Sequence, residues 1–205
     1  IRGQPPRGSW NRGYRHSPAY PPQEQLTFSP PSLPLRSEIG AHRKIDDFPG
    51  IIDVTLKLRD RFFPHAKVSV LSNATLIGRK AVSDALKKVD NPILKVDASD
   101  DRLVAMINKP VGTYRLGDVV ENLKGFEGNF ILQTMFLKSP DFDTAAPEPL
   151  AAWLDIVREL KPRQVMVYTI DRETPDKSLG KYTVAEMKDF VQPLVDEGYD
   201  VQIRG

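Results

Sequence analysis

The sequence predicts an α/β protein built on parallel strands, and two observations carry that prediction. First, segments with strand and helix patterns alternate at least four times between residues 48 and 205. Second, residues 129–137 (N-F-I-L-Q-T-M-F-L) form a short, almost wholly apolar run between Gly128 and Ser139-Pro140, typical of a strand buried on both faces. The alternation favours a parallel sheet or barrel, in which functional groups gather at the carboxyl ends of the strands.

The regular elements follow one another from residue 48 onward. Runs of apolar, β-favouring residues predict strands at 67–71, 92–96, 129–137, 164–170 and 200–203. Apolar residues at helical spacing predict helices at 48–63, 79–89, 101–107, 116–126, 147–160 and 184–196. Pro64, Pro110 and Gly198 punctuate these helices where a turn is expected.

Residues 1–47 differ from the remainder of the chain. They are rich in proline and arginine and poor in apolar residues, so they cannot bury enough surface to offset the entropy of ordering the chain. We expect this segment to be largely irregular, with strand character only at 25–29. A basic arm carrying Trp10, Tyr14 and Tyr20 could stack on single-stranded nucleic acid, but we favour an irregular tail.

Composition narrows the classes of function. The 205 residues suffice for one sizeable domain or part of a larger one, and a net charge of +2 gives no general reason to expect a nucleic-acid or membrane partner. No run approaches the roughly 20 apolar residues of a membrane helix. The chain has 0 cysteines, which excludes disulfides, cysteine nucleophiles and clusters held by its own thiolates. We expect a cytoplasmic location.

Polar residues stand at the predicted carboxyl ends of the strands: Ser72-Asn73, Asp97, Gln133-Thr134 and Thr169-Asp171-Arg172. If they meet at one rim, they form a candidate binding site. Gln133 is notable because burying an amide without a partner costs roughly 1–3 kcal/mol. Two interpretations stay open: Gln133 bonds a ligand, or it bonds a neighbouring backbone group. Asp97, Asp100 and Asp101 could suggest a cation site, but A-S-D-D before a helix is more simply an N-cap.

Five motifs in one order resemble the radical S-adenosylmethionine (radical SAM) enzymes, in particular their small iron–sulfur oxidoreductase-like branch. They are S-V-L-S-N-A-T-L (69–76), I-L-K-V-D-A (93–98), I-N-K-P (107–110), F-I-L-Q-T-M-F-L (130–137) and V-Y-T-I-D-R-E-T-P (167–175). The resemblance covers about residues 48–205 and implies the later units of a partial, TIM-like (β/α) barrel with parallel strands.

The resemblance also implies functional residues. By motif, S-N-A-T places Asn73 near adenosylmethionine, L-K-V-D-A places Lys95 and Asp97 near its ribose, and F-I-L-Q-T adds Gln133. Substrate-side positions are implied by the remaining two motifs: Asn108, Tyr168, Asp171 and Arg172. The implied cofactors are S-adenosylmethionine and a [4Fe–4S] cluster, and the implied substrate is a small molecule or macromolecule that the sequence does not identify.

Two departures from the family pattern stand beside these matches. The cysteine triad C-x3-C-x2-C that holds the family's cluster is absent, since the chain has 0 cysteines. The glycine-rich turn that follows T-F-S in the family is replaced after Ser29 by P-P-S-L-P-L-R-S-E. Three accounts fit: a fragment whose cluster-bearing part lies upstream, a frame-shifted reading of residues 1–45, or a degenerate member. We favour the first two.

The sequence therefore predicts a radical SAM-type oxidoreductase fragment that binds adenosylmethionine at the strand ends and is inactive alone, because thiolates are needed to hold the cluster. The alternative is a cluster-free α/β scaffold that binds a small ligand or a protein.

Overall fold

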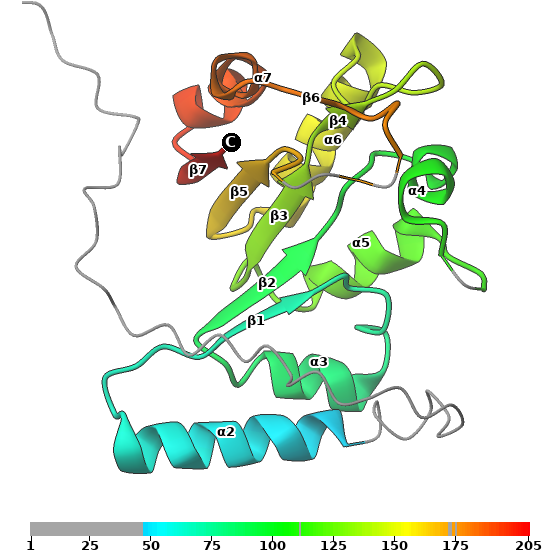
Figure 1. Cartoon of the computed structure of the whole chain (residues 1–205). Coiled ribbons are helices and arrows are strands. Elements are labelled where there is room, and N and C mark those ends of the chain that lie inside the picture. The colour runs from blue at the N-terminus through cyan, green and yellow to red at the C-terminus, as the bar shows by residue number, and fades with distance from the viewer. Residues whose placement is uncertain (1–46, 111, 172–173, 175) are drawn as a thin grey trace, which may run out of the picture.

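The computed structural model describes residues 47–110, 112–171, 174 and 176–205. The prediction of an irregular segment at 1–47 therefore lies almost wholly outside the described residues. From residue 48 onward strands and helices alternate as the sequence predicts (Figure 1).

The core of the fold is a parallel sheet of five strands in the order β1-β2-β3-β5-β7. These strands are β1 (Ser69–Ser72), β2 (Asn91–Lys95), β3 (Ile131–Met135), β5 (Gln164–Tyr168) and β7 (Val201–Arg204). Every neighbouring pair is parallel. The five strands form an open sheet within the described residues, which matches the predicted partial barrel.

Helices cover one face of this sheet (Figure 1). They are α3 (Lys80–Leu86), α5 (Leu116–Lys124), α6 (Pro147–Leu160) and α7 (Val184–Asp196). Their apolar stripes pack with alternate strand residues such as Leu94, Leu132 and Val165 in one large core. Because side chains alternate along a strand, the intervening residues lie on the opposite face.

Helix α2 (Phe48–Phe62) lies outside this layer and packs beside α3 through Ile52, which contacts the cluster around Ala85 and Val89. Helix α4 (Asp101–Asn108) follows β2 and has a small apolar cluster of its own. A short antiparallel pair, β4 (Leu137–Lys138) and β6 (Gly180–Lys181), joins the segments that follow β3 and β5. No helix in the described ranges is both long and apolar enough to cross a membrane.

Two caps show how the sequence fixes helix starts. Thr183 accepts a hydrogen bond from the Glu186 amide while the Glu186 carboxylate accepts from the Thr183 amide, which is a capping box at the start of α7. Asp100 accepts from the Leu103 amide at 2.8 Å and caps α4. The N-cap interpretation of A-S-D-D is thus confirmed for Asp100.

Candidate functional site

The sheet face opposite the helices carries a row of polar and sulfur-containing side chains, which runs from the last residue of β2 across the middle of the next strands. Lys95 of β2 is paired in register with Gln133 of β3, Gln133 with Met166 of β5, and Met166 with Gln202 of β7. These four residues therefore stand side by side across four strands, and we call them the polar row. An entirely apolar surface would be expected if this face were only a packing surface.

A second line of residues lies one step further toward the strand ends. Tyr168 is paired in register with Met135 on one side and with Arg204 on the other. Asp97 joins this line because its Oδ1 accepts a hydrogen bond from the Met135 amide at 3.1 Å. The predicted residues Lys95, Asp97, Gln133 and Tyr168 are consequently brought together at one end of one sheet face.

Lys95 and Asp97 form an ion pair at the centre of this group. Nζ of Lys95 lies 3.0 Å from Oδ2 of Asp97, whose side chain is only 2% exposed. Burial opposes the charge on Lys95, but the Asp97 carboxylate and the Tyr168 hydroxyl outweigh it, so the pKa of Lys95 lies above its usual value. The ammonium is also 5.7 Å from the centre of the Tyr168 ring. Lys95 is therefore held as a cation on the open face.

Gln133 has an unsatisfied hydrogen-bonding group. Its Nε2 donates a weak bond to Sδ of Met166 at 3.6 Å, and its Oε1 is buried without any hydrogen-bond partner. No other buried side-chain nitrogen or oxygen in the described residues lacks a partner. Of the two interpretations of Gln133, bonding of its carbonyl to the backbone is not observed. Gln133 faces away from the helices, because its strand neighbour Leu132 packs in the core on the helix side of the sheet.

Thr134, the neighbour of Gln133, points the other way and has a structural role. Its Oγ1 donates to the Val96 carbonyl at 2.7 Å and accepts from Trp153 Nε1 at 3.0 Å. Thr169 is similarly engaged, donating to the Phe136 carbonyl and accepting from the Tyr182 amide. Both threonines were grouped with the strand-end residues in the sequence, but they belong to the packed interior.

The remaining described residues of the prediction stand just after β1, at the end of α4 and after β5. Asn73 is exposed after β1, where its Oδ1 accepts from the amide and hydroxyl of Thr75 in a local turn. Asn108 is the exposed last residue of α4. Asp171 lines a separate cavity of about 330 Å³ beside Asp176 and Lys181. Arg172 lies outside the described residues.

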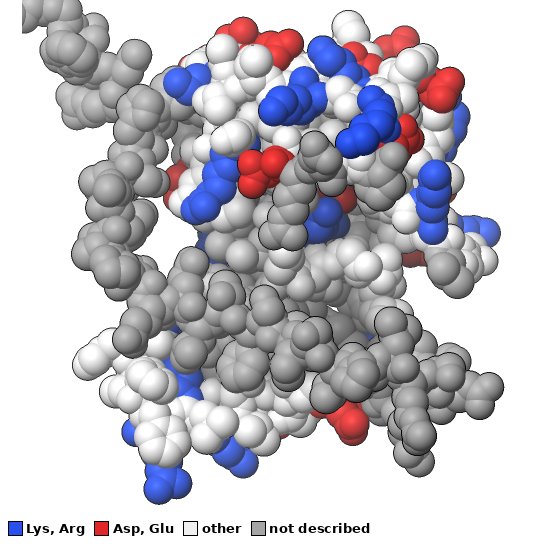
Figure 2. Space-filling model, viewed as in Figure 1, with Lys and Arg blue, Asp and Glu red and all other residues white. Residues whose placement is uncertain are grey.

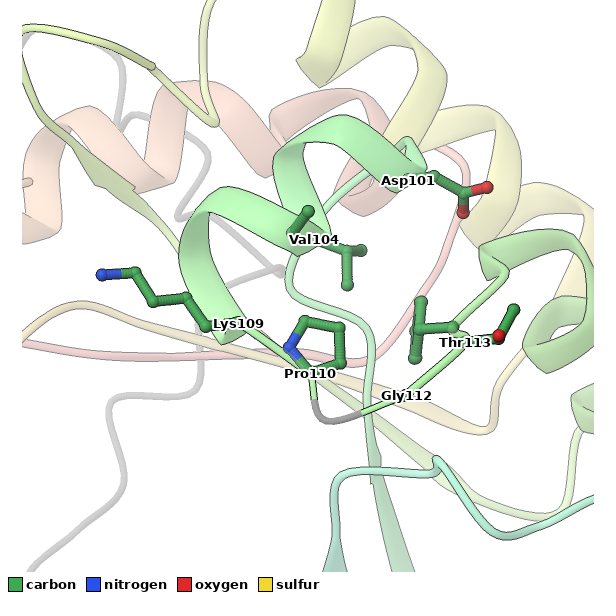
Figure 3. Close-up of a pocket in the computed structure, with 8 residues that line it drawn as sticks. Asp101, Val104, Lys109, Pro110, Gly112 and Thr113 are labelled. Carbon is green, nitrogen blue, oxygen red and sulfur yellow. The ribbon is translucent and has the colours of Figure 1, made fainter.

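Residues that the sequence did not single out also border the site. Tyr114 packs against the small cluster of α4, and burial together with the Asp97 and Asp101 carboxylates raises its pKa to about 12. It also lines a cavity of about 440 Å³ between α4 and the segment that follows it. In Figure 3, Val104, Pro110 and Thr113 lie toward this space, whereas Lys109 extends away from it.

Gln202 and Arg204 were not singled out either, although they continue the two lines of side chains onto β7. The only sequence signal available was their alternation with Val201 and Ile203, which places them on one face of a strand. Basic and acidic side chains are interspersed in the upper part of the face that Figure 2 shows, so no patch of a single charge marks a binding site there.

The site suits adenosylmethionine in part and does not suit the iron–sulfur cluster. The bare carbonyl of Gln133 requires an N–H or O–H donor, which a ribose hydroxyl or an amino group supplies, and the Lys95 ammonium suits a carboxylate. The cluster needs thiolates, and the chain has 0 cysteines. Within the described ranges, no group of three or more histidine, aspartate and glutamate residues could hold a metal ion.

Comparison with known proteins gives one curated relative and several solved structures. No family model matches the chain. The UPF0026 protein MJ1312 of Methanocaldococcus jannaschii is 27% identical over 124 residues, which is 58% of this chain and 37% of that protein. The chain thus matches little more than a third of its relative's length.

The solved structures are similar in fold. A domain of pyruvate-formate lyase-activating enzyme from Bacteroides vulgatus has a TM-score of 0.60 at 10% identity and covers 82% of this chain and 96% of that one. SuiB of Streptococcus suis, solved with S-adenosylmethionine, has a TM-score of 0.54 at 17% identity, covering 77% of this chain and 34% of SuiB. A radical SAM methyltransferase from Sphaerobacter thermophilus has a TM-score of 0.52 at 16% identity, and the match covers 66% of this chain and 39% of the methyltransferase.

The chain is therefore a parallel α/β protein of the partial-barrel class, with a polar group on the open face of its sheet. More particularly, its fold is similar to those of pyruvate-formate lyase-activating enzyme, SuiB and a radical SAM methyltransferase, in agreement with the fold that the motifs of the sequence predict. At these identities the likeness concerns the fold, and it leaves cofactor and substrate to be tested on this chain.

Proposed function

We propose that the chain is the later part of a radical SAM-type oxidoreductase barrel and binds S-adenosylmethionine on the polar row. The observation that carries this proposal is the buried Oε1 of Gln133, which has no donor and faces the open side of the sheet. A site of this kind gains affinity only from a ligand that brings a hydroxyl or N–H group to that atom. The fold supports the choice of adenosylmethionine among such ligands.

Each neighbouring side chain has a defined part in this proposal. Gln133 accepts a hydrogen bond from a ribose hydroxyl or from the amino group, and Lys95 binds the carboxylate while Asp97 holds its ammonium in place. The Tyr168 ring and the Met166 thioether provide an apolar contact surface beside Gln133 and Lys95. When bound to a cluster, adenosylmethionine supplies radical chemistry, and the protein contributes binding, orientation and exclusion of water.

We also propose that the chain does not perform this chemistry alone. Thiolates hold such clusters, and imidazole or carboxylate groups are poor replacements for three of them. Anaerobic reconstitution with iron and sulfide tests this point, because a cluster would be visible in the absorption spectrum and, after reduction, in the electron paramagnetic resonance spectrum. A stoichiometric [4Fe–4S] cluster on the purified 205-residue chain would overturn the proposal.

Calorimetric titration with S-adenosylmethionine tests the binding step. Gln133→Leu should weaken binding about tenfold, the equivalent of one hydrogen bond. Gln164→Leu is the matched control, since Gln164 stands on the same sheet face at the far end of β5 and already bonds Asp200 at 2.7 Å. Equal losses in both variants would remove Gln133 from the site.

The alternative function is a cluster-free α/β scaffold that binds another ligand or a protein at the same face. The observation in its favour is the count of 0 cysteines. Absence of heat with adenosylmethionine in the wild-type chain would favour this alternative over the first proposal.

A further inference from the structure

Strand β7 brings two polar side chains to the open face of the sheet, and the proposed function gives neither of them a part. Val201 and Ile203 pack against the core on the helix side. Because side chains alternate along a strand, Gln202 and Arg204 lie on the opposite, open face, and we call them the β7 pair. Figure 1 shows β7 beside β5 at one end of the sheet.

The side chains of the β7 pair make no hydrogen bond, ion pair or ring contact within the part of the chain that the structure describes. Other polar side chains of the same face each bond to a neighbour: Lys95 to Asp97, Gln133 to Met166 and Gln164 to Asp200. Arg204 is exposed and Gln202 is half-buried. Their donor groups are therefore available to a ligand that lies on this face.

Charge is unbalanced at the β7 end of the open face. The Lys95 ammonium lies 3.0 Å from the Asp97 carboxylate, so these two charges offset each other. The Arg204 guanidinium has no carboxylate beside it among the described residues, and an arginine is not deprotonated in proteins. Adenosylmethionine carries a sulfonium, an ammonium and a carboxylate, so its net charge is positive and adds to this excess. The face therefore favours an additional anion.

Arg204 stands next to the proposed adenosylmethionine site. Tyr168, its register partner on β5, has its ring centre 5.7 Å from the Lys95 ammonium. Neighbouring strands are about 4.8 Å apart, so Arg204 begins one strand beyond that ring. Tyr168 and Arg204 are the last residues of their strands, and ligands of parallel sheets bind at these ends. An anion held by Arg204 would therefore lie beside a ligand bound at Gln133 and Lys95.

We propose that the β7 pair is a subsite for an oxyanion of the substrate, either a carboxylate or a phosphate. The Arg204 guanidinium offers parallel N–H groups that match two oxygens of such an anion. The Gln202 amide supplies both a donor and an acceptor to a neighbouring polar group of the same ligand. The proposal rests on the proposed function only in calling this ligand the substrate, because neither residue is assigned to adenosylmethionine.

Titration of the 15N-labelled full chain with benzoate and with phenyl phosphate tests the subsite in the absence of adenosylmethionine. The backbone amide signals of residues 201–205 should shift on binding in the nuclear magnetic resonance spectrum. Arg204→Gln should weaken binding of the tighter probe at least about tenfold, because it removes a charge-assisted pair of hydrogen bonds. Which of the two probes binds more tightly distinguishes a carboxylate subsite from a phosphate subsite.

Three further measurements separate a specific fork from charge in general. Arg61→Gln is the matched control, because it removes the same charge from the exposed last turn of α2 and should leave binding unchanged. Arg204→Lys keeps the charge without the planar fork and should restore only part of the affinity. Thermal unfolding of Arg204→Gln should match that of the wild type, since this side chain is exposed and has no partner among the described residues.

Calorimetric titration with adenosylmethionine distinguishes failure of the subsite from failure of the proposed function. If both hold, a saturating probe should tighten adenosylmethionine binding about twofold in the wild type, because the anion offsets its positive charge. Arg204→Gln should abolish this gain. Probe binding that depends on Arg204 while adenosylmethionine gives no heat would support the anion subsite and count against the proposed function.

Two results would overturn the subsite. One is an Arg204→Gln variant that binds both probes within about twofold of the wild type, including the case in which neither probe shifts the amides of 201–205. The other is competition between the probe and adenosylmethionine, which would place the anion at Lys95 instead of at the β7 pair.

Discussion

Lys95 and Asp97 lie two residues apart on the same strand end and form an ion pair of 3.0 Å on the open face of the sheet. The Met135 amide donates a hydrogen bond to the Asp97 carboxylate, so the position of the carboxylate does not depend on Lys95 alone. The pair therefore holds a charged ammonium at the site without consuming all of its donors, because a lysine ammonium has three.

Removing the carboxylate should destabilise the protein and change its response to pH. Asp97→Asn should lower the free energy of unfolding by about 1–2 kcal/mol, because a half-buried ammonium loses its partner. The raised pKa of Lys95 means that this stabilisation is complete below the unfolded-state value of about 10.4 and fades as the pH rises through the folded-state value.

Urea unfolding of the wild type and Asp97→Asn from pH 7 to pH 11 measures this effect. The difference between them should stay constant up to about pH 10 and then narrow. A cycle with Lys95→Met isolates the pair, with an expected coupling of about 1 kcal/mol. A coupling of zero would mean that Asp97 acts only through the Met135 amide.

Removing the polar group of Gln133 and removing that of Thr134 should change the free energy of unfolding in opposite directions. Gln133→Leu should raise the free energy of unfolding of the ligand-free chain by about 1 kcal/mol, because it removes a buried acceptor without a donor. Thr134→Val should lower it by about 1–2 kcal/mol, because the Val96 carbonyl and Trp153 Nε1 then lose their partner. Destabilisation by both changes would contradict the unsatisfied state of Gln133.

Tyr114 should titrate later than an exposed tyrosine. Its pKa is raised to about 12 by burial and by the Asp97 and Asp101 carboxylates. Above about pH 10 the unfolded chain loses this proton while the folded chain keeps it, so stability falls with rising pH. Burial also raises the pKa of Tyr182 and of Tyr199, so ultraviolet titration of phenolate should show a late component to which several tyrosines contribute. Its amplitude should fall by one tyrosine in Tyr114→Phe, and an unchanged amplitude would contradict the prediction.

Gly128 should tolerate alanine far less well than Gly198. Both have positive φ, +77° and +92°, but a Cβ at Gly128 would lie 2.5 Å from the Lys161 carbonyl oxygen, whereas nothing lies within 4 Å at Gly198. Gly198→Ala should lower the free energy of unfolding by about 1 kcal/mol through backbone strain alone. Gly128→Ala should lower it by about 3 kcal/mol or more, because the clash adds to the strain. Thermal unfolding measures both, and equal losses would show that the backbone around Lys161 yields.

The sequence predicts the architecture well because strand and helix periodicity are local properties. It also places Lys95, Asp97, Gln133 and Tyr168 at strand ends, and the parallel sheet brings those ends together. The sequence does not show which polar residue of a strand faces the site. Thr134 is polar and adjacent to Gln133, yet its side chain lies on the opposite face of the sheet, toward Trp153. The predictions for Asn73, Asn108 and Asp171 as ligand contacts stay untested.

Other parts of the site depend on tertiary contacts that no local pattern encodes. Tyr114 reaches the neighbourhood of Asp97 from an irregular segment after Pro110, so its role follows from how α4 packs. Gln202 and Arg204 join the site through the register of β7 with β5. The β4–β6 pair is two residues long on each side, too short for a periodic signal.

The opposite directions of Gln133 and Thr134 have a consequence for how β3 finds its place in the sheet. A slip of one residue would turn the Gln133 amide into the apolar helix layer and leave Trp153 Nε1 without an acceptor. A sheet with β3 misaligned by one residue is therefore destabilised in two ways, once through Gln133 and once through Thr134. The Gln133 side chain, which we propose as a ligand contact, therefore also opposes misalignment of β3.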